Sequence, residues 1–369
     1  MATQVETALP AQLEPLTLKT YVHPPATKLQ LDYAEIPVLD LGLVDLPGGK
    51  EKLVAQLKDA VEQTGFFYVV NFGLSQADID RQFAIGKEVL NLPEKEKLQY
   101  RANLEDGDYN GYRPLGMIEQ YPGLRDNWEC YHVFKFIEEH QRTHPKVIQD
   151  HYAEIEKFNR HLHQNVAHSV LRLLANVLEI PEEFFVDNHQ YEESCSSFSR
   201  YVKYHARTPE LNEKYKDIFV RGHTDFGSVT FVFSQPVGGL QLQARDGSWK
   251  AVRHIPGSIV VNTADMLHFW TNTYLQSCVH RVVAPPADQV ELDRYGLIYF
   301  LRPGNKTCLR SVDSPLLRRL GLSAENESED LKRKREVTVG EWVPIQTKKN
   351  WTPHDQQPQS GAEFQSLFR

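Results

Sequence analysis

The stretch IFVRGHTDFGSVTFVF, residues 218–233, places a histidine and an aspartate between two runs of β-forming residues. Branched and aromatic side chains favour extended backbone, so we expect this stretch to form strands. His223 and Asp225 are two residues apart, and residues at that spacing in a strand share one face. We therefore expect the imidazole and the carboxylate to point in the same direction. A chain with 15 histidines and 49 acidic residues contains such a pair by chance, so the pair alone indicates little.

Similar β-rich runs lie on either side of this stretch at close spacing. They are bounded by turn-forming pairs such as Asp246-Gly247 and Pro285-Pro286. The runs are SFSRYVKY, GGLQLQ, WKAV, SIVVNT, CVHRVVA and YGLIYFL. Several short strands at this spacing predict a β-sandwich or barrel of the jelly-roll type.

Helical periodicity is strongest in the first half of the chain. Apolar residues recur every three or four positions over residues 53–61 and again from about 148 to 178, which predicts two amphipathic helices. The run FFYVVNF, residues 66–72, is typical of a buried strand. We therefore predict a mixed α/β fold with a mainly β core that is backed by helices.

These patterns divide the chain into four parts. Residues 1–35, with scattered prolines and no periodicity, are expected to form an N-terminal arm over the core. Residues 36–145 would form an N-terminal α/β segment, and residues 146–351 the long helix and the β-rich catalytic core. Residues 352–369 are polar and predict a loose C-terminal tail.

Composition restricts the partners that we expect. The 369 residues carry a net charge of −8 and contain no apolar run of membrane-spanning length. Because no excess of basic residues is available for phosphates, we expect neither nucleic acid nor a membrane as a partner. The four cysteines form no CxxC pair and the N-terminus lacks a secretory signal, which favours a cytoplasmic protein with reduced thiols. A monomer or a homodimer would fit.

A second histidine of interest lies in the run SCVHRVV, where we expect His280 in the middle of a strand. Two histidines and one carboxylate on one side of a metal leave adjacent coordination positions open, as in non-haem Fe(II) oxygenases. The same ligands on Zn²⁺ would activate a water for hydrolysis. The ligands alone therefore leave an Fe(II) oxygenase and a zinc hydrolase open, and a metal-free jelly-roll binding module is a third alternative.

Arg294 follows His280 by 14 residues, and a turn over the polar stretch between them would return it on a neighbouring strand. A guanidinium inside a cavity lined by a sheet is costly to bury unless it meets an anion. An ordinary ion pair with an aspartate or glutamate is the alternative. The position relative to His280 favours a bound carboxylate.

In this order, the motifs resemble those of the Fe(II)/2-oxoglutarate-dependent dioxygenases of the isopenicillin N synthase-like family, over most of the chain. The family's HxD, distal histidine and arginine motifs look like His223-Thr-Asp225, His280 within HRV, and Arg294-Tyr-Gly296. Flanking segments are also similar, namely IPVLDL, GFFYVVNFG, NGYRPLG, DNWE, GLQLQ, DGSW and PGSIVVN.

The resemblance implies a distorted double-stranded β-helix in which His223, Asp225 and His280 bind iron. It also implies that Arg294 binds the distal carboxylate of 2-oxoglutarate and that Tyr204, in VKYHA, reaches this co-substrate. The implied enzyme uses Fe(II), 2-oxoglutarate and O2 and releases succinate and CO2. Its substrate, a small natural product of secondary metabolism, would be hydroxylated, desaturated or rearranged.

The sequence departs from the family pattern at Gly296, where the family has a serine. A missing hydroxyl costs on the order of 1 kcal/mol unless Tyr204 or Thr230 replaces its hydrogen bond. The chain lacks a YPPCP motif, and in this respect it resembles microbial or fungal relatives. Oxidases of the family use O2 without 2-oxoglutarate and keep the same arginine for a substrate carboxylate. Such an oxidase therefore remains an alternative.

Six residues close to these motifs are candidates for the wall of a substrate pocket. An aromatic wall would suit a small apolar or aromatic natural product. The candidates are Tyr112, Arg113, Phe134, Phe226, Phe269 and Trp270.

Overall fold

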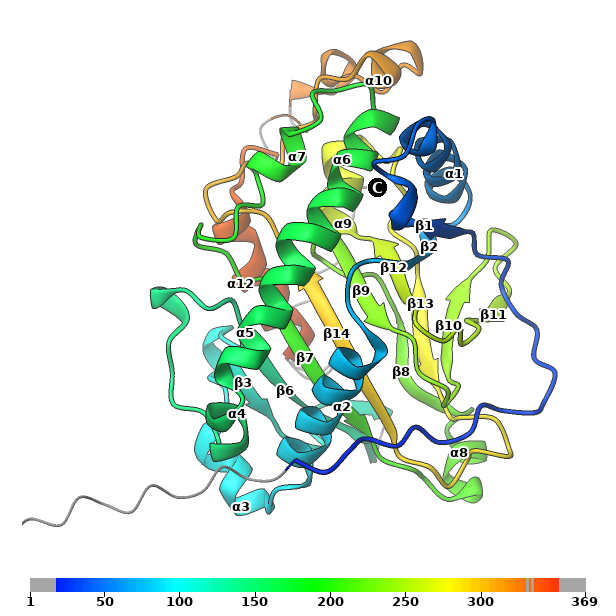
Figure 1. The fold of residues 1–369 in the computed structure, drawn as a ribbon, viewed down its shortest axis with the longest axis vertical. Coiled ribbons are helices and arrows are strands. Elements are labelled where there is room, and N and C mark those ends of the chain that lie inside the picture. Colours follow the sequence, from blue (N-terminus) through cyan, green and yellow to red (C-terminus); the bar gives the residue numbers. More distant parts are fainter. Residues whose placement is uncertain (1–17, 122, 330–331, 333–334, 352–369) are drawn as a thin grey trace, which may run out of the picture.

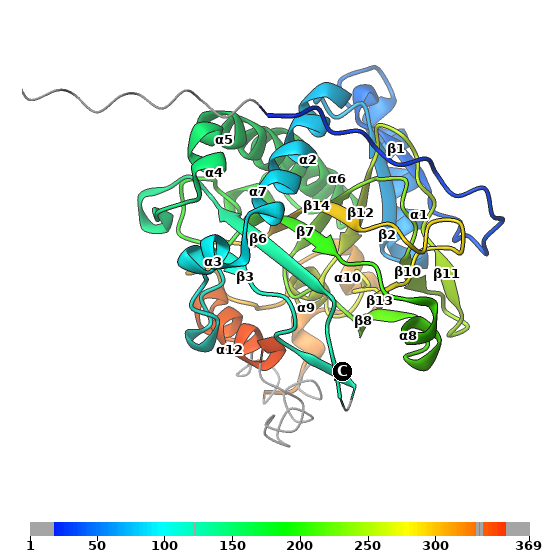
Figure 2. The ribbon, with the colours of Figure 1, turned by 90° about the horizontal axis from the view of Figure 1, so that it is seen from below.

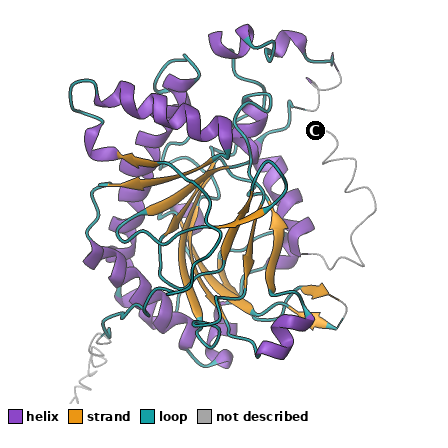
Figure 3. Ribbon diagram, turned by 90° about the vertical axis from the view of Figure 1, so that its right-hand side faces the viewer, coloured by secondary structure: helices purple, strands orange, loops and turns teal. Residues whose placement is uncertain are grey.

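The computed structural model describes residues 18–121, 123–329, 332 and 335–351. Two β-sheets form its centre, and helices pack on the outer side of the larger sheet (Figures 1 and 3). This arrangement confirms the predicted jelly roll backed by helices. The predicted tail, residues 352–369, lies outside the described residues.

The larger sheet has eight strands in the order β1-β2-β12-β9-β14-β7-β6-β3, so early strands flank late ones on both sides. β1 and β2 are parallel, and the other neighbours are antiparallel. The strands are β1 (Val38–Asp40), β2 (Phe66–Val70), β12 (Ile259–Thr263), β9 (Val229–Phe233), β14 (Arg294–Leu301), β7 (Phe198–Tyr204), β6 (Trp128–Phe134) and β3 (Gly111–Arg113).

The smaller sheet has four antiparallel strands in the order β11-β10-β13-β8. A separate two-stranded hairpin, β4-β5, precedes β6. These strands are β8 (Ile218–His223), β10 (Leu240–Gln243), β11 (Trp249–Ala251), β13 (His280–Val283), β4 (Glu119–Tyr121) and β5 (Leu124–Arg125).

The helices begin and end where capping and apolar spacing allow. α2 begins after Ser75, whose side chain and that of Asp78 cap each other's backbone N–H groups. The α-helices are α1 (Gly49–Gln63), α2 (Gln76–Asn91), α3 (Glu94–Lys97), α4 (Lys146–Asp150), α5 (Tyr152–His161), α6 (His168–Val177), α7 (Phe184–Asp187), α8 (Pro209–Lys214), α9 (Asp265–Trp270), α10 (Pro315–Arg319) and α12 (Val339–Trp351). Short 3₁₀ turns are formed by Leu41–Leu43, Leu98–Tyr100, Leu104–Asp106, Glu138–His140 and Ala324–Asn326.

The long helix predicted for the middle of the chain is confirmed as α5, a π-helical segment (Leu162–Ala167) and α6. Its buried stripe, including Ile155, Phe158 and Val170, packs on the large sheet. His163 in the π-helical segment contacts the hydroxyl of Tyr299 on β14 at 2.7 Å, which ties the helix to the sheet. α12 packs at the opposite side of the molecule from α1, against the Leu104–Asp106 turn (Figure 2).

The strand that carries Arg294 lies in a different sheet from the strand that carries His280. We expected β14 to lie beside β13, and this prediction is wrong. β14 belongs to the large sheet and β13 to the small one. The chain crosses between the sheets after Val283, as jelly-roll connections do, so Arg294 and His280 reach the same cavity from opposite walls.

The described part of the N-terminal arm, residues 18–35, runs over the surface of the core (Figure 1). Thr27 donates a hydrogen bond to Asp288 at 2.7 Å, and His23 contacts Asp80 on α2 at 2.9 Å. The proposed boundaries at residues 35, 145 and 351 stay predictions. Strands from residues 36–145 pair directly with strands from residues 146–351, so a single sheet spans the proposed boundary at residue 145. Within the described ranges, no helix has both the length and the apolar character needed to cross a bilayer.

Candidate metal and co-substrate site

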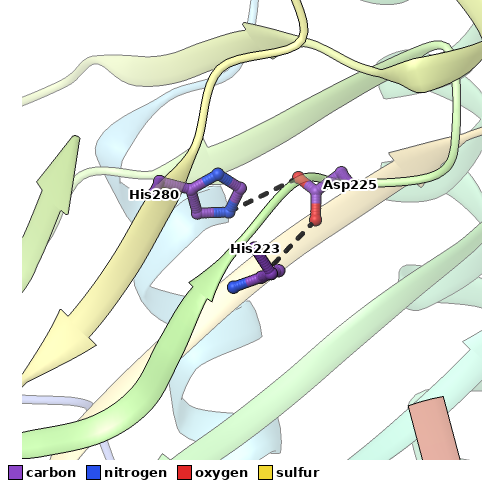
Figure 4. A group of neighbouring side chains, drawn as sticks. All are labelled: His223, Asp225 and His280. Carbon is purple, nitrogen blue, oxygen red and sulfur yellow. Dashed lines mark ion pairs between the residues drawn. The ribbon is translucent and has the colours of Figure 1, made fainter. Parts of the chain in front are cut away.

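His223, Asp225 and His280 come together between the two sheets (Figure 4). Their ligand atoms all lie within 4.8 Å of one another. The Asp225 carboxylate lies 3.9 Å from His223 Nε2 and 3.7 Å from His280 Nε2. These separations are too long for hydrogen bonds, so the three side chains do not hydrogen-bond to one another.

The two histidines are direct cross-strand partners. His223 ends β8, His280 begins β13, and their rings lie 4.4 Å apart between centroids. Two details of our prediction are therefore wrong: His280 is not in mid-strand, and Asp225 lies in the turn after β8. The turn, not strand alternation, brings Asp225 beside the imidazoles.

Neighbouring groups hold each side chain in the orientation that a metal ligand needs. The Nδ1 atoms of His223 and His280 face the carbonyl oxygens of Arg221 and Cys278, at 2.9 and 3.2 Å. An N–H at Nδ1 leaves the lone pair on Nε2, the atom that faces Asp225. Asn262 donates a hydrogen bond to the Asp225 carboxylate at 3.0 Å.

The charge states of these groups suit a divalent cation. Partial burial in the cavity, together with the adjacent His280, lowers the pKa of His223 below its ordinary value, although 41% of its side chain is exposed, and this favours the neutral imidazole. Burial by itself would raise the pKa of Asp225, but the two imidazoles and Asn262 outweigh it and lower the pKa. Two imidazoles and one carboxylate are the donor set of a non-haem Fe(II) site, so the residues present fit iron.

Arg294 is buried in the wall of the same cavity, at the start of β14. Its Nε donates a long hydrogen bond to the Val237 carbonyl at 3.3 Å, and its guanidinium lies 5.4 Å from the centre of the Tyr204 ring. Among the described residues, no carboxylate lies within ion-pair distance of it. Burial lowers the pKa of Arg294, which means that the charged guanidinium is destabilised here. No carboxylate among the described residues offsets this destabilisation.

The residues predicted to accompany Arg294 have distinct positions. Tyr204, the cross-strand partner of Arg294, and Thr230 both line the cavity. Gly296 lies on the same face of β14 as Arg294. A β-carbon built on Gly296 would lie 2.9 Å from Cγ1 of Val202, so the space of a serine is taken by the valine.

We expect Gly296→Ser to lower the free energy of unfolding by about 1–3 kcal/mol through overpacking. Urea unfolding measures this loss. In the double variant Gly296→Ser/Val202→Ala the clash is removed, and a serine hydroxyl beside Arg294 should tighten 2-oxoglutarate binding by up to about fivefold. A stable single variant would contradict the steric explanation.

Five of the six residues predicted for the substrate wall lie elsewhere. Tyr112 points to the helix side of the sheet, where its hydroxyl donates to Glu129 at 2.6 Å. Phe134, the cross-strand partner of Phe198, stacks on it but is not part of the cavity wall. On α9, Phe269 contacts Trp342 and Trp270 stacks on Phe185. Closeness in sequence to the motifs did not reveal which face of an element each residue occupies. Phe226 is the predicted residue that does line the cavity.

Arg113 is the fifth residue, and it supports the wall from behind. It forms a fully buried ion pair with Asp126 at 2.6 Å, and its guanidinium lies 3.7 Å from the centre of the Trp128 ring. Trp128 in turn lines the cavity. Arg113 therefore positions a wall residue instead of facing a substrate.

We expect Arg113→Ala to destabilise the fold by about 3–5 kcal/mol, because it leaves the buried Asp126 carboxylate without its partner. Chemical unfolding provides the measurement. Arg81→Ala, which breaks the exposed pair with Glu154, is the matched control and should cost less than about 1 kcal/mol. Equal losses would argue against a special role for the buried pair.

The cavity has a volume of about 240 Å³, and sequence reasoning missed much of its wall. Residues two apart on β7 and β14 face it, as strand alternation requires. They include Phe198 and Arg200 on β7, and Ile298 and Phe300 on β14, followed by Arg302. The alternating pattern that starts at Arg294 was the available signal for Phe300 and Arg302.

The fold and this site together define a non-haem iron oxygenase of the jelly-roll class, and comparison with known proteins agrees. Residues 193–303 match the 2OG-Fe(II) oxygenase superfamily, and residues 36–158 match the N-terminal region of the non-haem dioxygenases in morphine synthesis. A relative from Schizosaccharomyces pombe, UPF0676 protein C1494.01, is 30% identical over 316 residues, which cover 84% of this chain and 90% of the relative. The chain belongs to the 2OG-Fe(II) oxygenase superfamily.

Two further comparisons define the class of enzyme. The 2-oxoglutarate-dependent dioxygenase gloE of Glarea lozoyensis is 28% identical over 75% of this chain and 83% of its own. A crystal structure of Neurospora crassa T7H in complex with alpha-KG has a TM-score of 0.73 at 22% identity and covers 88% of this chain and 99% of its own, which shows the shared fold. The chain is thus a 2-oxoglutarate/Fe(II)-dependent dioxygenase that uses Fe(II), 2-oxoglutarate and O2.

Proposed function

We propose that His223, Asp225 and His280 hold the iron and that Arg294 binds the distal carboxylate of 2-oxoglutarate. The observation that carries this proposal is a buried guanidinium with no carboxylate partner among the described residues, in the same cavity as the three ligands. Tyr204 and Thr230 are proposed to contact the same co-substrate, since both line this part of the cavity. The missing side chain at Gly296 leaves room for Val202, which packs against this position beside the guanidinium.

With 2-oxoglutarate bound, Fe(II) supplies O2 activation, which couples decarboxylation of the keto acid to succinate and CO2 with oxidation of the substrate. The chain's own residues then have three tasks. Asn262 keeps the Asp225 carboxylate oriented, Arg294 fixes the far end of the co-substrate, and the aromatic wall excludes water from the reacting groups.

The substrate is proposed to be a small natural product with an aromatic or apolar body. The support is the composition of the cavity wall beyond the metal ligands, which includes Phe226, Phe198, Phe300 and Trp128. Hydroxylation, desaturation and rearrangement are all compatible with this chemistry.

Anaerobic spectroscopy tests the proposed site directly. Adding Fe(II) and 2-oxoglutarate to the metal-free protein should produce a weak visible charge-transfer band that neither addition produces alone. Zn²⁺ in place of Fe(II) is the control and should give no band. Iron binding without a band at saturating 2-oxoglutarate would favour an oxidase that does not use the keto acid, and hydrolysis with Zn²⁺ would favour the hydrolase.

We also propose that the chain acts in the cytoplasm as a monomer or homodimer, without nucleic acid or a membrane as a partner. The net charge of −8 and the four free cysteines support this proposal. Light scattering of the purified chain at micromolar concentration measures the oligomeric state.

A further inference from the structure

Two arginines other than Arg294 line the cavity, and no carboxylate among the described residues pairs with either of them. Among the described residues, neither Arg200 nor Arg302 has a carboxylate within ion-pair distance, although both belong to the cavity wall. Arg302 lies at the end of the cavity wall away from Arg294, and Arg200, the cross-strand partner of Ile298, lies about halfway between them. Arg294 begins β14 and Arg302 directly follows its last residue, and since extended backbone rises about 3.3 Å per residue, their backbones are roughly 25 Å apart.

Arg200 is oriented by a neutral group. Its Nε donates a hydrogen bond to Nε2 of His132 at 2.9 Å, while Nδ1 of that histidine faces the Tyr109 carbonyl at 2.6 Å. Burial, reinforced by the charges of Arg200 and Arg113, holds the pKa of His132 well below its ordinary value. The histidine therefore fixes the guanidinium without cancelling its charge, and no hydrogen bond from a described residue occupies the two terminal nitrogens of Arg200.

Arg302 is held in a similar way. Its Nη1 donates to the backbone carbonyl and the hydroxyl of Ser196, at 3.0 and 2.9 Å, and its buried Nε has no hydrogen-bond partner within the described part of the chain. The guanidinium lies 4.5 Å from the centre of the Phe226 ring. Phe226 directly follows the proposed metal ligand Asp225 in the sequence. Burial lowers the pKa of Arg302 to about 9, so it remains charged at neutral pH.

Phe198 and Phe300 form the part of the cavity wall beside the two arginines, and Phe134, which is outside the wall, stacks on Phe198. Phe198 lies between Phe134 and Phe300, with centroid separations of 5.2 and 4.8 Å and rings tilted by 19° in both pairs. Arg200 lies 5.7 Å and Arg302 5.2 Å from the centre of the Phe198 ring. A flat apolar group can pack on this surface while its polar end reaches the guanidinium groups.

Charge balance supports an anionic ligand. Fe(II) and Arg294 carry three positive charges, which Asp225 and the 2-oxoglutarate dianion offset. The loaded site therefore keeps the two charges of Arg200 and Arg302. Burying guanidinium groups without an anion is unfavourable, whereas a carboxylate in fork geometry makes strong charge-assisted hydrogen bonds with them.

We propose that the substrate is an organic carboxylate with a flat apolar body, which packs on Phe198 and Phe300 while Arg200 and Arg302 bind its carboxylate. This inference rests on the proposed function and narrows its substrate class. A neutral substrate with carbonyl oxygens, and a phosphate ester, are the outcomes that the experiment separates from it.

The test is anaerobic binding to protein loaded with Fe(II) and 2-oxoglutarate, so that the Arg294 site is already filled. The probes are 2-naphthoate and phenylacetate, each compared with its primary amide, and phenyl phosphate. Binding is followed by tryptophan fluorescence, since Trp128 lines the cavity, and by the shift of the visible band. We expect each acid to bind on the order of 10-fold more tightly than its amide.

Charge-removing variants locate this preference. In Arg200→Gln and Arg302→Gln the preference for acid over amide should fall towards one, while the visible band still forms. Arg200→Lys keeps a positive charge at position 200 and should therefore keep part of the preference. This variant still tests the proposal if Arg302→Gln does not fold. Arg207→Gln removes a buried arginine outside the cavity and should leave the preference unchanged.

Several results would overturn the proposal. They are equal binding of acids and amides, tighter binding of phenyl phosphate than of both acids, an acid preference that survives both glutamine variants, or no acid binding at millimolar concentration. A missing visible band in the unmodified protein would instead count against the iron and co-substrate site. In that case acid binding to the metal-free protein, and its loss in Arg200→Gln, still test the anion site separately.

Discussion

Asp225→Ala is expected to abolish turnover and to weaken Fe(II) binding by more than about 100-fold. Asp225 is the carboxylate of the three-residue cluster, so its removal leaves two neutral imidazoles and takes away the charge that offsets the metal. The expected loss exceeds the 10–100-fold that removal of an outer partner of a metal ligand typically costs. Iron content after gel filtration and oxygen consumption with 2-oxoglutarate measure the two effects.

Asn262→Ala is the matched control for this prediction. It removes the hydrogen bond to the carboxylate but leaves all three ligands in place. We expect iron binding to weaken by about 10–100-fold and turnover to persist at saturating iron. Normal oxygen uptake by Asp225→Ala, with iron retained, would refute the ligand role of Asp225.

The same cluster shows how far the sequence could predict the site. The residue types, the β-rich surroundings and the order of motifs were enough to predict that His223, Asp225 and His280 come together. The local reason was only partly right, because β8 ends at His223 and the turn after it positions Asp225. Strand ends depend on pairing with distant segments, here with β13, and the local sequence does not contain that information.

The wall of the cavity was harder to predict for a related reason. Tyr112 is as aromatic as Phe198, but the two lie on opposite faces of the large sheet. Alternation along a strand predicts which residues share a face of the sheet. It does not predict which of the two faces points into the cavity. A single anchor resolves this ambiguity. Once Arg294 is placed in the cavity, alternation along β14 places Ile298 and Phe300 there as well, and the register with β7 adds Arg200 opposite Ile298.

The two sheets also explain why three arginines can serve one cavity. Arg294 and Arg302 mark the two ends of the cavity-facing side of β14, and Arg200 faces the same space from β7. A strand of this length thus separates a co-substrate end from a substrate end, with the metal ligands contributed mainly by the opposite sheet. This separation predicts that changes at one end leave ligand binding at the other largely intact.

Arg294→Leu is expected to raise the 2-oxoglutarate concentration needed for half-maximal rate by about 10–100-fold. A charge-assisted fork contributes about 1.5–3 kcal/mol, and leucine fills the space without offering a donor. Titration of the visible band with 2-oxoglutarate gives the same quantity as a binding constant. Arg294→Lys keeps the charge but not the fork, so its loss should be intermediate.

A second keto acid separates this role from a general loss of packing. 2-Oxopentanoate has no distal carboxylate, so the unmodified protein should bind it far more weakly than 2-oxoglutarate. In Arg294→Leu the two keto acids should bind almost equally, because the group that distinguishes them is gone. If the variant still prefers 2-oxoglutarate by the original factor, then Arg294 does not bind the distal carboxylate and its buried charge must serve the substrate instead.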